Sequence, residues 1–176
     1  IPFTYVLMII GTLALTGFPF LSGYYSKEAI IEFAYLRGST IGYFAAAVGI
    51  FTALLTAIYS WRLIFKTFHG KYNNKENNLS SIKESHLMMI IPSSLLAVGA
   101  IIAGFLFKEI FIGNESFNFW SDSILFLNTF NHDHLPILLV VLTPAIVILA
   151  IPISYYLFIQ NEKILKNFII KNNFIY

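Results

Sequence analysis

Three charged residues stand in an apolar stretch, where buried charge could carry protons. Lys27 and Glu28 are adjacent and Glu32 follows one helical turn later, while seven of the nine residues in 28–36 are apolar. An ammonium group inside a membrane costs at least about 2.5–3.5 kcal/mol, so Lys27 needs a partner, water or a lowered pKa. Two carboxylates one turn apart repel unless one is protonated or a cation lies nearby. The pattern favours a proton relay of Lys27, Glu28 and Glu32.

A break in the helix is expected just before these charges. The apolar stretch 1–36 is too long for one straight span, because roughly 35 residues rise about 52 Å, against about 30 Å of hydrocarbon. Its middle contains Gly17, Pro19 and Gly23, residue types that end or interrupt helices. We therefore expect a discontinuous transmembrane helix, broken near Gly17–Gly23, with Lys27 just beyond the break.

A second interpretation of the charged residues stays open. Lys27 could extend its ammonium group to the membrane surface, with Glu28 and Glu32 simply marking the end of a helix in water. The break favours the relay, because broken helices place polar groups near the midplane of membrane transporters.

The composition is that of an integral membrane protein. Of its 176 residues, 57% are hydrophobic and 11% are charged, and the mean hydropathy is +0.74, whereas soluble domains carry roughly 25% charged residues. A net charge of +2 gives no reason to expect a nucleic-acid partner, and membrane lipid is the expected surrounding. The chain has no cysteine, which excludes disulfides, iron–sulfur ligation and thiol catalysis by its own residues. The first residue is isoleucine, so we expect a piece of a longer product.

The apolar segments predict an all-α integral membrane fold with about four transmembrane helices, the first one discontinuous. The expected elements are a discontinuous transmembrane helix at 1–36, transmembrane helices at 41–68, 87–107 and 135–159, a basic loop at 70–86, an opposite-side loop at 108–134 and an amphipathic tail at 160–176. Lysines gather in the basic loop and the tail, and acidic residues in the opposite-side loop. By the positive-inside rule, the basic loop and the tail face the cytoplasm or the mitochondrial matrix.

Polar residues of the second segment are weaker candidates. Thr52 and Thr56 could line a channel, although helix packing explains them better. Arg62 could pair with a carboxylate of another helix, but an anchor at the membrane surface is favoured. His69 precedes Gly70, which favours a helix end with a glycine cap over proton transfer. A stripe of small residues on the same helix favours close helix packing: Ala45, Gly49, Ala53 and Ala57.

Other motifs give no catalytic centre. His132, Asp133 and His134 are close together, but two histidines and one acid beside a proline are better explained as a loop end than as a metal site. The sequence contains no phosphate-binding glycine loop, no serine–histidine–aspartate set and no nucleotide fingerprint. We expect no catalytic residue, no metal and no cofactor in this chain itself.

Two motifs resemble one family. Residues 11–28, GTLALTGFPFLSGYYSKE, strongly resemble the discontinuous twelfth helix of the antiporter-like chain 5 family (bacterial subunit L) of respiratory complex I. Residues 60–70, SWRLIFKTFHG, are similar to the end of the family's next helix. The resemblance implies the C-terminal part of a proton-translocating subunit. Lys27 matches the mid-membrane lysine of the family's Ser-Lys-Asp motif, and Glu28 replaces the usual aspartate.

The resemblance also implies partners and a location. The expected partners are the remainder of the same subunit and other membrane-arm subunits, with NADH, FMN, iron–sulfur clusters and quinone bound by partner subunits. The expected location is the mitochondrial inner membrane or a bacterial plasma membrane, crossed several times. The family's earlier helices and its lateral helix are missing from this sequence, so the chain cannot pump protons alone. A multisubunit cation/proton antiporter and a purely structural fragment of a membrane arm remain alternatives.

Overall fold

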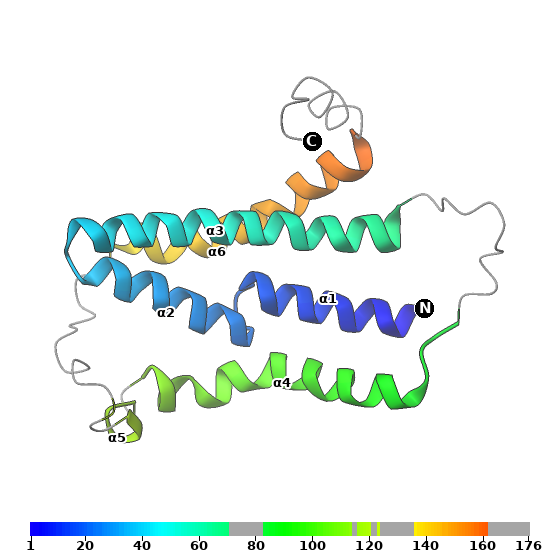
Figure 1. Ribbon diagram of the computed structural model, residues 1–176, viewed down its shortest axis with the longest axis horizontal. Coiled ribbons are helices and arrows are strands. Elements are labelled where there is room, and N and C mark those ends of the chain that lie inside the picture. Colours follow the sequence, from blue (N-terminus) through cyan, green and yellow to red (C-terminus); the bar gives the residue numbers. More distant parts are fainter. Residues whose placement is uncertain (71–82, 114–115, 121–122, 124–135, 162–176) are drawn as a thin grey trace.

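The computed structural model is built of helices (Figure 1) and describes residues 1–70, 83–113, 116–120, 123 and 136–161. Its helices are α1 (Pro2–Thr16), α2 (Ser22–Leu36), α3 (Thr40–Ile64), the π-helical η1 (Phe65–His69), α4 (Leu87–Phe111), α5 (Ser116–Trp120), α6 (Ile137–Tyr155) and the π-helical η6 (Tyr156–Gln160). Three helical stretches are long and apolar enough to cross a membrane: α3 with η1, α4, and α6 with η6. The described part contains no strand, so the expected all-α membrane fold is confirmed.

The first two helices lie nearly end to end, as the first segment predicted. In Figure 1, α1 and α2 run along one line beside α3, with α4 on their other side. Because the chain stops and restarts between them, neither helix exceeds 15 residues, although the pair extends about as far as α3. This arrangement places the interruption between two long neighbouring helices.

The tightest packing joins α3 to α6, which run in the same direction. Ala46 packs with Leu139 near the start of both helices, and the rings of Phe65 and Tyr155 meet near their ends, 5.4 Å apart. Ala57 on α3 has no exposed surface. Small side chains allow two helix backbones to approach closely in a membrane.

The predicted stripe of small residues is right for one part of α3 and wrong at its start. Ala53 and Ala57 are buried, whereas Ala45 is exposed and Ala46 takes its place in the interface. A helix has 3.6 residues per turn, so strict steps of four drift off a straight contact line. The buried residues of α3 are therefore spaced by three as well as by four positions.

Some helix bounds differ from the sequence-based ones. α4 continues to Phe111, four residues beyond the expected end at 107, and the Lys108 and Glu109 side chains in this extension are about half exposed. The second and fourth segments lie at Thr40–His69 and Ile137–Gln160. Nearly all of the amphipathic tail and most of both predicted loops lie outside the described residues.

Candidate functional site

The end of α1 is closed by the glycine that the sequence singled out. Gly17 has φ +80°, a left-handed conformation that costs other residues about 1–2 kcal/mol. In this conformation its amide donates to the carbonyl of Ala14 (3.3 Å), and the amide of Phe18 donates to that of Leu13 (3.0 Å). Two of the four carbonyls that every helix end leaves without an intrahelical partner are thereby satisfied.

The chain between the two helices is short and non-helical. Pro19 has no amide hydrogen to extend α1, and the next residue, Phe20, adopts φ +71°, which is uncommon for a residue other than glycine. Its side chain is 80% exposed in the described part of the protein. The chain re-enters a helix where the amide of Tyr24 donates to the carbonyl of Leu21 (3.1 Å).

Gly23 allows α2 to begin directly against the end of α1. A Cβ atom at this position would overlap the backbone carbonyl of Ala14. That obstacle is backbone, which cannot rotate away as a side chain can. The glycine is therefore required by space, and its removal would push the two helices apart.

Lys27 reaches back across the break to the end of α1. Its Nζ donates to the carbonyl of Thr16 (3.0 Å) and more weakly to that of Leu15 (3.5 Å). Its aliphatic chain passes over Gly17, where a Cβ would lie 3.3 Å from Cδ. These two carbonyls are the remaining pair that the α1 end leaves open. The ammonium also lies at the C-terminal end of a helix, whose dipole favours a positive charge.

The partner of Lys27 was not anticipated from its sequence neighbours. The sequence indicated a need for a partner, water or the loss of the proton without naming a partner, and the structure supplies two backbone carbonyls that come 11 and 12 residues earlier. The signal that could have pointed to them is the predicted break itself, because a helix that ends inside a membrane leaves carbonyls without partners.

Glu28 is the most deeply buried charged side chain among the described residues. It is 9% exposed, and its Oε1 atom has no hydrogen-bond partner within the described part of the chain. The phenol of Tyr24, one turn earlier, interacts with the same carboxyl group. A buried carboxyl oxygen without a partner is costly unless water or a proton reaches it. Glu32 lies one turn further along α2 and is only partly buried.

The three charged residues therefore share α2, but they face different surroundings. Lys27 is held by the end of α1, whereas Glu28 is packed on the helix face that carries Tyr24. Transfer of a proton from one of them to the next stays a prediction.

Thr52 and Thr56 use their hydroxyl groups within α3. Thr52 Oγ1 donates to the carbonyl of Val48 (2.8 Å) and Thr56 Oγ1 to that of Thr52 (2.7 Å), each one turn earlier. Thr52 is exposed and Thr56 partly exposed, so neither lies in the buried contact between α3 and α6. Such bonds to the preceding turn are common for hydroxyl side chains within helices.

Arg62 and His69 lie at the end of α3 and in η1. The guanidinium group of Arg62 lies 5.5 Å from the centre of the Phe158 ring in η6, a cation–π contact. His69 Nε2 lies 3.3 Å from the hydroxyl of Tyr5, and its ring also meets the ring of Phe65. The Arg62–Phe158 contact and the His69–Tyr5 contact each join the ends of two different helices.

The helix ends at His69 with Gly70 as its cap, as the sequence predicted. Gly70 has φ −70° and ψ 162°, an extended conformation that any residue can adopt, and not the left-handed one that favours glycine. Glycine is needed there for space instead, because a Cβ would press on the carbonyl of Lys66.

Glu84 is a structural residue that sequence reasoning missed. It precedes α4, yet its carboxylate accepts from the amides of Phe3 (2.8 Å) and Thr4 (3.3 Å) and from the Thr4 hydroxyl (2.6 Å). The hydroxyl bond and the amide bonds lower the pKa of Glu84 below its ordinary value. A carboxylate at a helix N-terminus satisfies open amides and suits the helix dipole. No local sequence pattern could have predicted this contact, because Thr4 and Glu84 lie 80 residues apart.

Metal binding has no support in the described residues. These residues contain no group of three histidine or carboxylate side chains placed to hold an ion. The pair His132 and His134 lies outside the described residues.

Comparisons with known proteins give one consistent result. No family model matches the chain. It is 43% identical over 127 residues to NADH-ubiquinone oxidoreductase chain 5 of Marchantia polymorpha, and 44% identical over 126 residues to that of Arabidopsis thaliana, in both cases over 72% of this chain. The protein of the same name from Dictyostelium citrinum is 46% identical over 112 residues. The aligned part is 17–19% of each relative, so the chain spans about a fifth of their length.

Proposed function

Because the chain belongs to the family of NADH-ubiquinone oxidoreductase chain 5, we propose that it carries the buried lysine of a proton-translocating membrane-arm subunit. In this proposal Lys27 accepts and releases protons in the middle of the membrane, and Glu28 and Glu32 pass them on. In this proposal the whole subunit acts within respiratory complex I, where electron transfer from NADH to quinone in other subunits drives the movement of protons across the membrane.

One observation carries the proposal, which is the placement of Lys27 at the helix break. Its ammonium rests on the carbonyls of Leu15 and Thr16, which are dipoles rather than a full counter-charge. A lysine held by dipoles can lose its proton without leaving an unpaired carboxylate behind. A lysine in a tight ion pair would be harder to discharge, because its partner favours the charged form.

The carboxyl group of Glu28 supports the same proposal. Its Oε1 atom has no hydrogen-bond partner among the described residues and belongs to the residue after Lys27, where a water molecule or a transferred proton would satisfy it. We propose that the remainder of the same subunit and other membrane-arm subunits supply the rest of the path. NADH, FMN, iron–sulfur clusters and quinone belong to partner subunits in this proposal, and the membrane is the mitochondrial inner membrane or a bacterial plasma membrane.

The contacts of Lys27 also favour a second candidate, a purely structural role. The ammonium completes the hydrogen bonding at the end of α1, and a residue that does only this would serve to hold the break together. The two roles predict different consequences for a variant that removes the amine.

The deciding experiment compares Lys27→Ala with Lys66→Ala, which removes a lysine from η1, away from the break. Both variants are examined in membranes by native gel, to measure assembly, and by the number of protons moved per NADH oxidised. The proposal expects Lys27→Ala to assemble and to move fewer protons per NADH, with Lys66→Ala unchanged. A loss of assembly equal to the loss of activity would favour the structural role instead. Sodium-dependent transport without NADH would indicate an antiporter.

A further inference from the structure

One side of α1 carries a line of hydroxyl groups that the proton transfer proposed above does not use. Tyr5, Thr12 and Thr16 follow one another after seven and four residues, which places them within about 40° of each other around a helix of 3.6 residues per turn. Thr12 is 6% exposed and Thr16 has no exposed surface. This hydroxyl line therefore runs along a buried side of α1, from its first turn to its last.

The hydroxyl line faces α3 rather than α4. The residues of α1 that line a groove against α4 lie on the opposite side of the helix, among them Leu7, Gly11 and Ala14. Tyr5 and Leu13 pack instead against a cluster at the end of α3 and the start of η1, which consists of Trp61, Ile64 and Phe65. The hydroxyl line therefore lies in the seam between α1 and α3.

The hydroxyl line begins at an exposed histidine and ends at Lys27. The Tyr5 hydroxyl lies 3.3 Å from Nε2 of His69, whose side chain is exposed. At the other end, the carbonyl of Thr16 accepts a hydrogen bond from Nζ of Lys27 (3.0 Å). The eleven residues from Tyr5 to Thr16 span about 16 Å at 1.5 Å per residue. The seam thus joins the end of η1 to the amine that is proposed to carry protons.

Ser60 of α3 brings a hydroxyl group without a partner to the same seam. It is 3% exposed, and its Oγ has no hydrogen-bond partner among the described residues. Ser60 lies 18 residues after Gly42, which is five helical turns, so both are on the same side of α3. That side faces α2, because a Cβ at Gly42 would overlap the carbonyl of Ala34. Since α1 continues the line of α2 beside α3 (Figure 1), Ser60 faces α1.

Ser60 also lies level with the two threonines. α1 and α3 run in opposite directions (Figure 1), and the Tyr5–His69 contact fixes their alignment. Ser60 comes nine residues before His69, and the position nine residues after Tyr5 falls between Thr12 and Thr16. Hydroxyl groups from both helices therefore meet at the same depth, close to the break.

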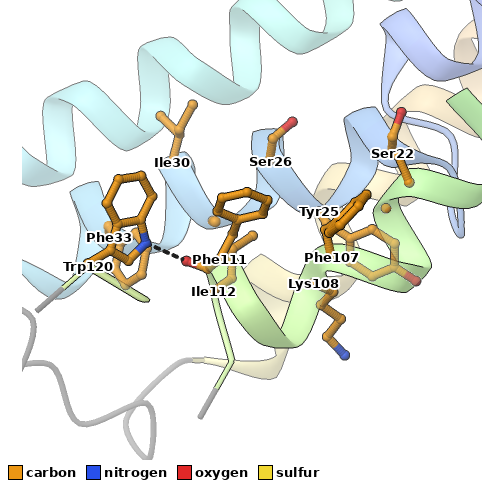
Figure 2. A pocket seen from close by; sticks show the side chains of 13 residues that line it. Ser22, Tyr25, Ser26, Ile30, Phe33, Phe107, Lys108, Phe111, Ile112 and Trp120 are labelled. Carbon is orange, nitrogen blue, oxygen red and sulfur yellow. Dashed lines mark hydrogen bonds between the residues drawn. The ribbon is translucent and has the colours of Figure 1, made fainter. Parts of the chain in front are cut away.

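The groove between α2 and α4 shows the opposite condition. The hydroxyl of Ser26 donates to the carbonyl of Gly23 (3.3 Å), and the indole of Trp120 donates to the carbonyl of Phe111 (3.1 Å). These polar groups are satisfied by backbone. The rest of the wall is largely apolar and includes Ile30, Phe33 and Phe107 (Figure 2). Unsatisfied polar atoms thus distinguish the α1–α3 seam from this groove.

The polar atoms in the seam suit water as their partner. Trp61, beside Ser60, is 7% exposed, and its Nε1 also has no partner among the described residues. Buried polar groups in proteins are nearly always hydrogen-bonded, either to protein atoms or to ordered water. An indole can only donate a hydrogen bond, whereas a serine hydroxyl can donate and accept. A water molecule can serve both, because it accepts and donates hydrogen bonds and typically makes about three.

We propose that water molecules in the seam between α1 and α3 carry protons between the membrane surface at Tyr5 and His69 and the amine of Lys27. This inference rests on the proposed function, for which it supplies one route. Each water molecule accepts one proton and releases one, so the water is unchanged. When Lys27 is loaded, an N–H bond forms at its amine as an O–H bond of the neighbouring hydronium breaks. Discharge of Lys27 reverses both changes.

The first test is a cryo-EM map of the assembled protein that resolves ordered water. We expect a water molecule within about 2.7–3.2 Å of Ser60 Oγ, followed by further water molecules toward Tyr5 and toward Thr16. A map in which a group from the rest of the subunit binds Ser60 Oγ, with no water in the seam, would overturn the proposal.

The second test removes hydroxyl groups with little change of shape. The variants are Tyr5→Phe and Thr12→Val, and their matched controls are Tyr59→Phe and Thr52→Val, whose side chains are exposed on α3. We expect each seam variant to assemble on a native gel and to move protons about tenfold more slowly, the change expected when a path loses about one hydrogen bond. The controls should keep the wild-type rate.

Lys27→Ala separates a failure of this route from a failure of the proposed function. If Lys27→Ala lowers the protons moved per NADH while Tyr5→Phe and Thr12→Val match their controls, the route is overturned and the role of Lys27 stands. If Lys27→Ala leaves that yield unchanged, the proposed function fails and the route fails with it. Should Thr12→Val not assemble, Tyr5→Phe at the outer end still decides.

Discussion

Replacing Gly23 by alanine tests whether the close contact at the helix break positions Lys27. The added Cβ would overlap the carbonyl of Ala14, so α2 has to move away from α1 by roughly 1 Å to restore van der Waals separation. Lys27 Nζ now lies 3.0 Å from the Thr16 carbonyl. A displacement of that size takes the pair beyond hydrogen-bond range, which ends near 3.5 Å.

The expected magnitude follows from the same contact. Forcing an extra carbon into packed backbone costs about 1–3 kcal/mol. Replacing glycine by alanine within a helix also stabilises the helix by about 1 kcal/mol. The control must therefore be another glycine-to-alanine replacement within a helix. Gly11→Ala provides it, because a Cβ at Gly11 in α1 meets nothing within 4 Å. The difference in stability between Gly23→Ala and Gly11→Ala therefore measures the cost of the clash with Ala14.

The assay measures the thermal stability of the assembled protein in membranes, together with the protons moved per NADH. Gly23→Ala should be less stable than Gly11→Ala by about 1–3 kcal/mol and should move fewer protons per NADH. A Gly23→Ala protein that matches Gly11→Ala in both measurements would refute the reasoning, because Lys27 would then not depend on the spacing of the two helices.

Further predictions concern other positions. Gly17→Ala should destabilise the assembled protein by about 1–2 kcal/mol in thermal unfolding, because alanine is strained at φ +80°, and Gly17→Asn should cost less. Thr52→Val and Thr56→Val should leave proton yield unchanged, because both hydroxyls bond to their own helix; a lower yield would instead favour a channel lining. Glu84→Gln should destabilise the protein at neutral pH. Because the folded-state pKa of Glu84 is lowered by the Thr4 hydroxyl and the adjoining amides, its contribution is present above the ordinary glutamate pKa and is lost as pH falls through the folded value. Thermal unfolding followed from neutral pH into acid should show the difference between wild type and Glu84→Gln disappearing.

The interruption of the first helix could be read from the sequence because its causes are local. A proline lacks an amide hydrogen and a glycine tolerates a left-handed backbone wherever they occur. The length of the apolar stretch against the membrane thickness required a break, and Gly17 and Pro19 marked its place. Membrane character followed in the same way from composition, and the family followed from the motif that contains Lys27.

The sequence could not predict which residues of different helices contact one another. The carbonyls that hold Lys27 become its neighbours only because α2 starts against the end of α1. Glu84 reaches Thr4 only because α4 lies beside α1. The rotation of α3 that buries Ala46 rather than Ala45 is likewise set by contact with α2 and α6.

There is a physical reason why some of these features could be predicted from the sequence and others could not. Composition, helix-breaking residues and span length are properties of short stretches of chain, and the membrane acts on them directly, so the sequence by itself determined them. Hydrogen-bond partners, cavity walls and the buried side of a helix depend on which surfaces pack together, and residues far apart in the chain contribute equally to that packing. The position of the Lys27 ammonium group at the end of α1 was therefore decided only by the tertiary structure.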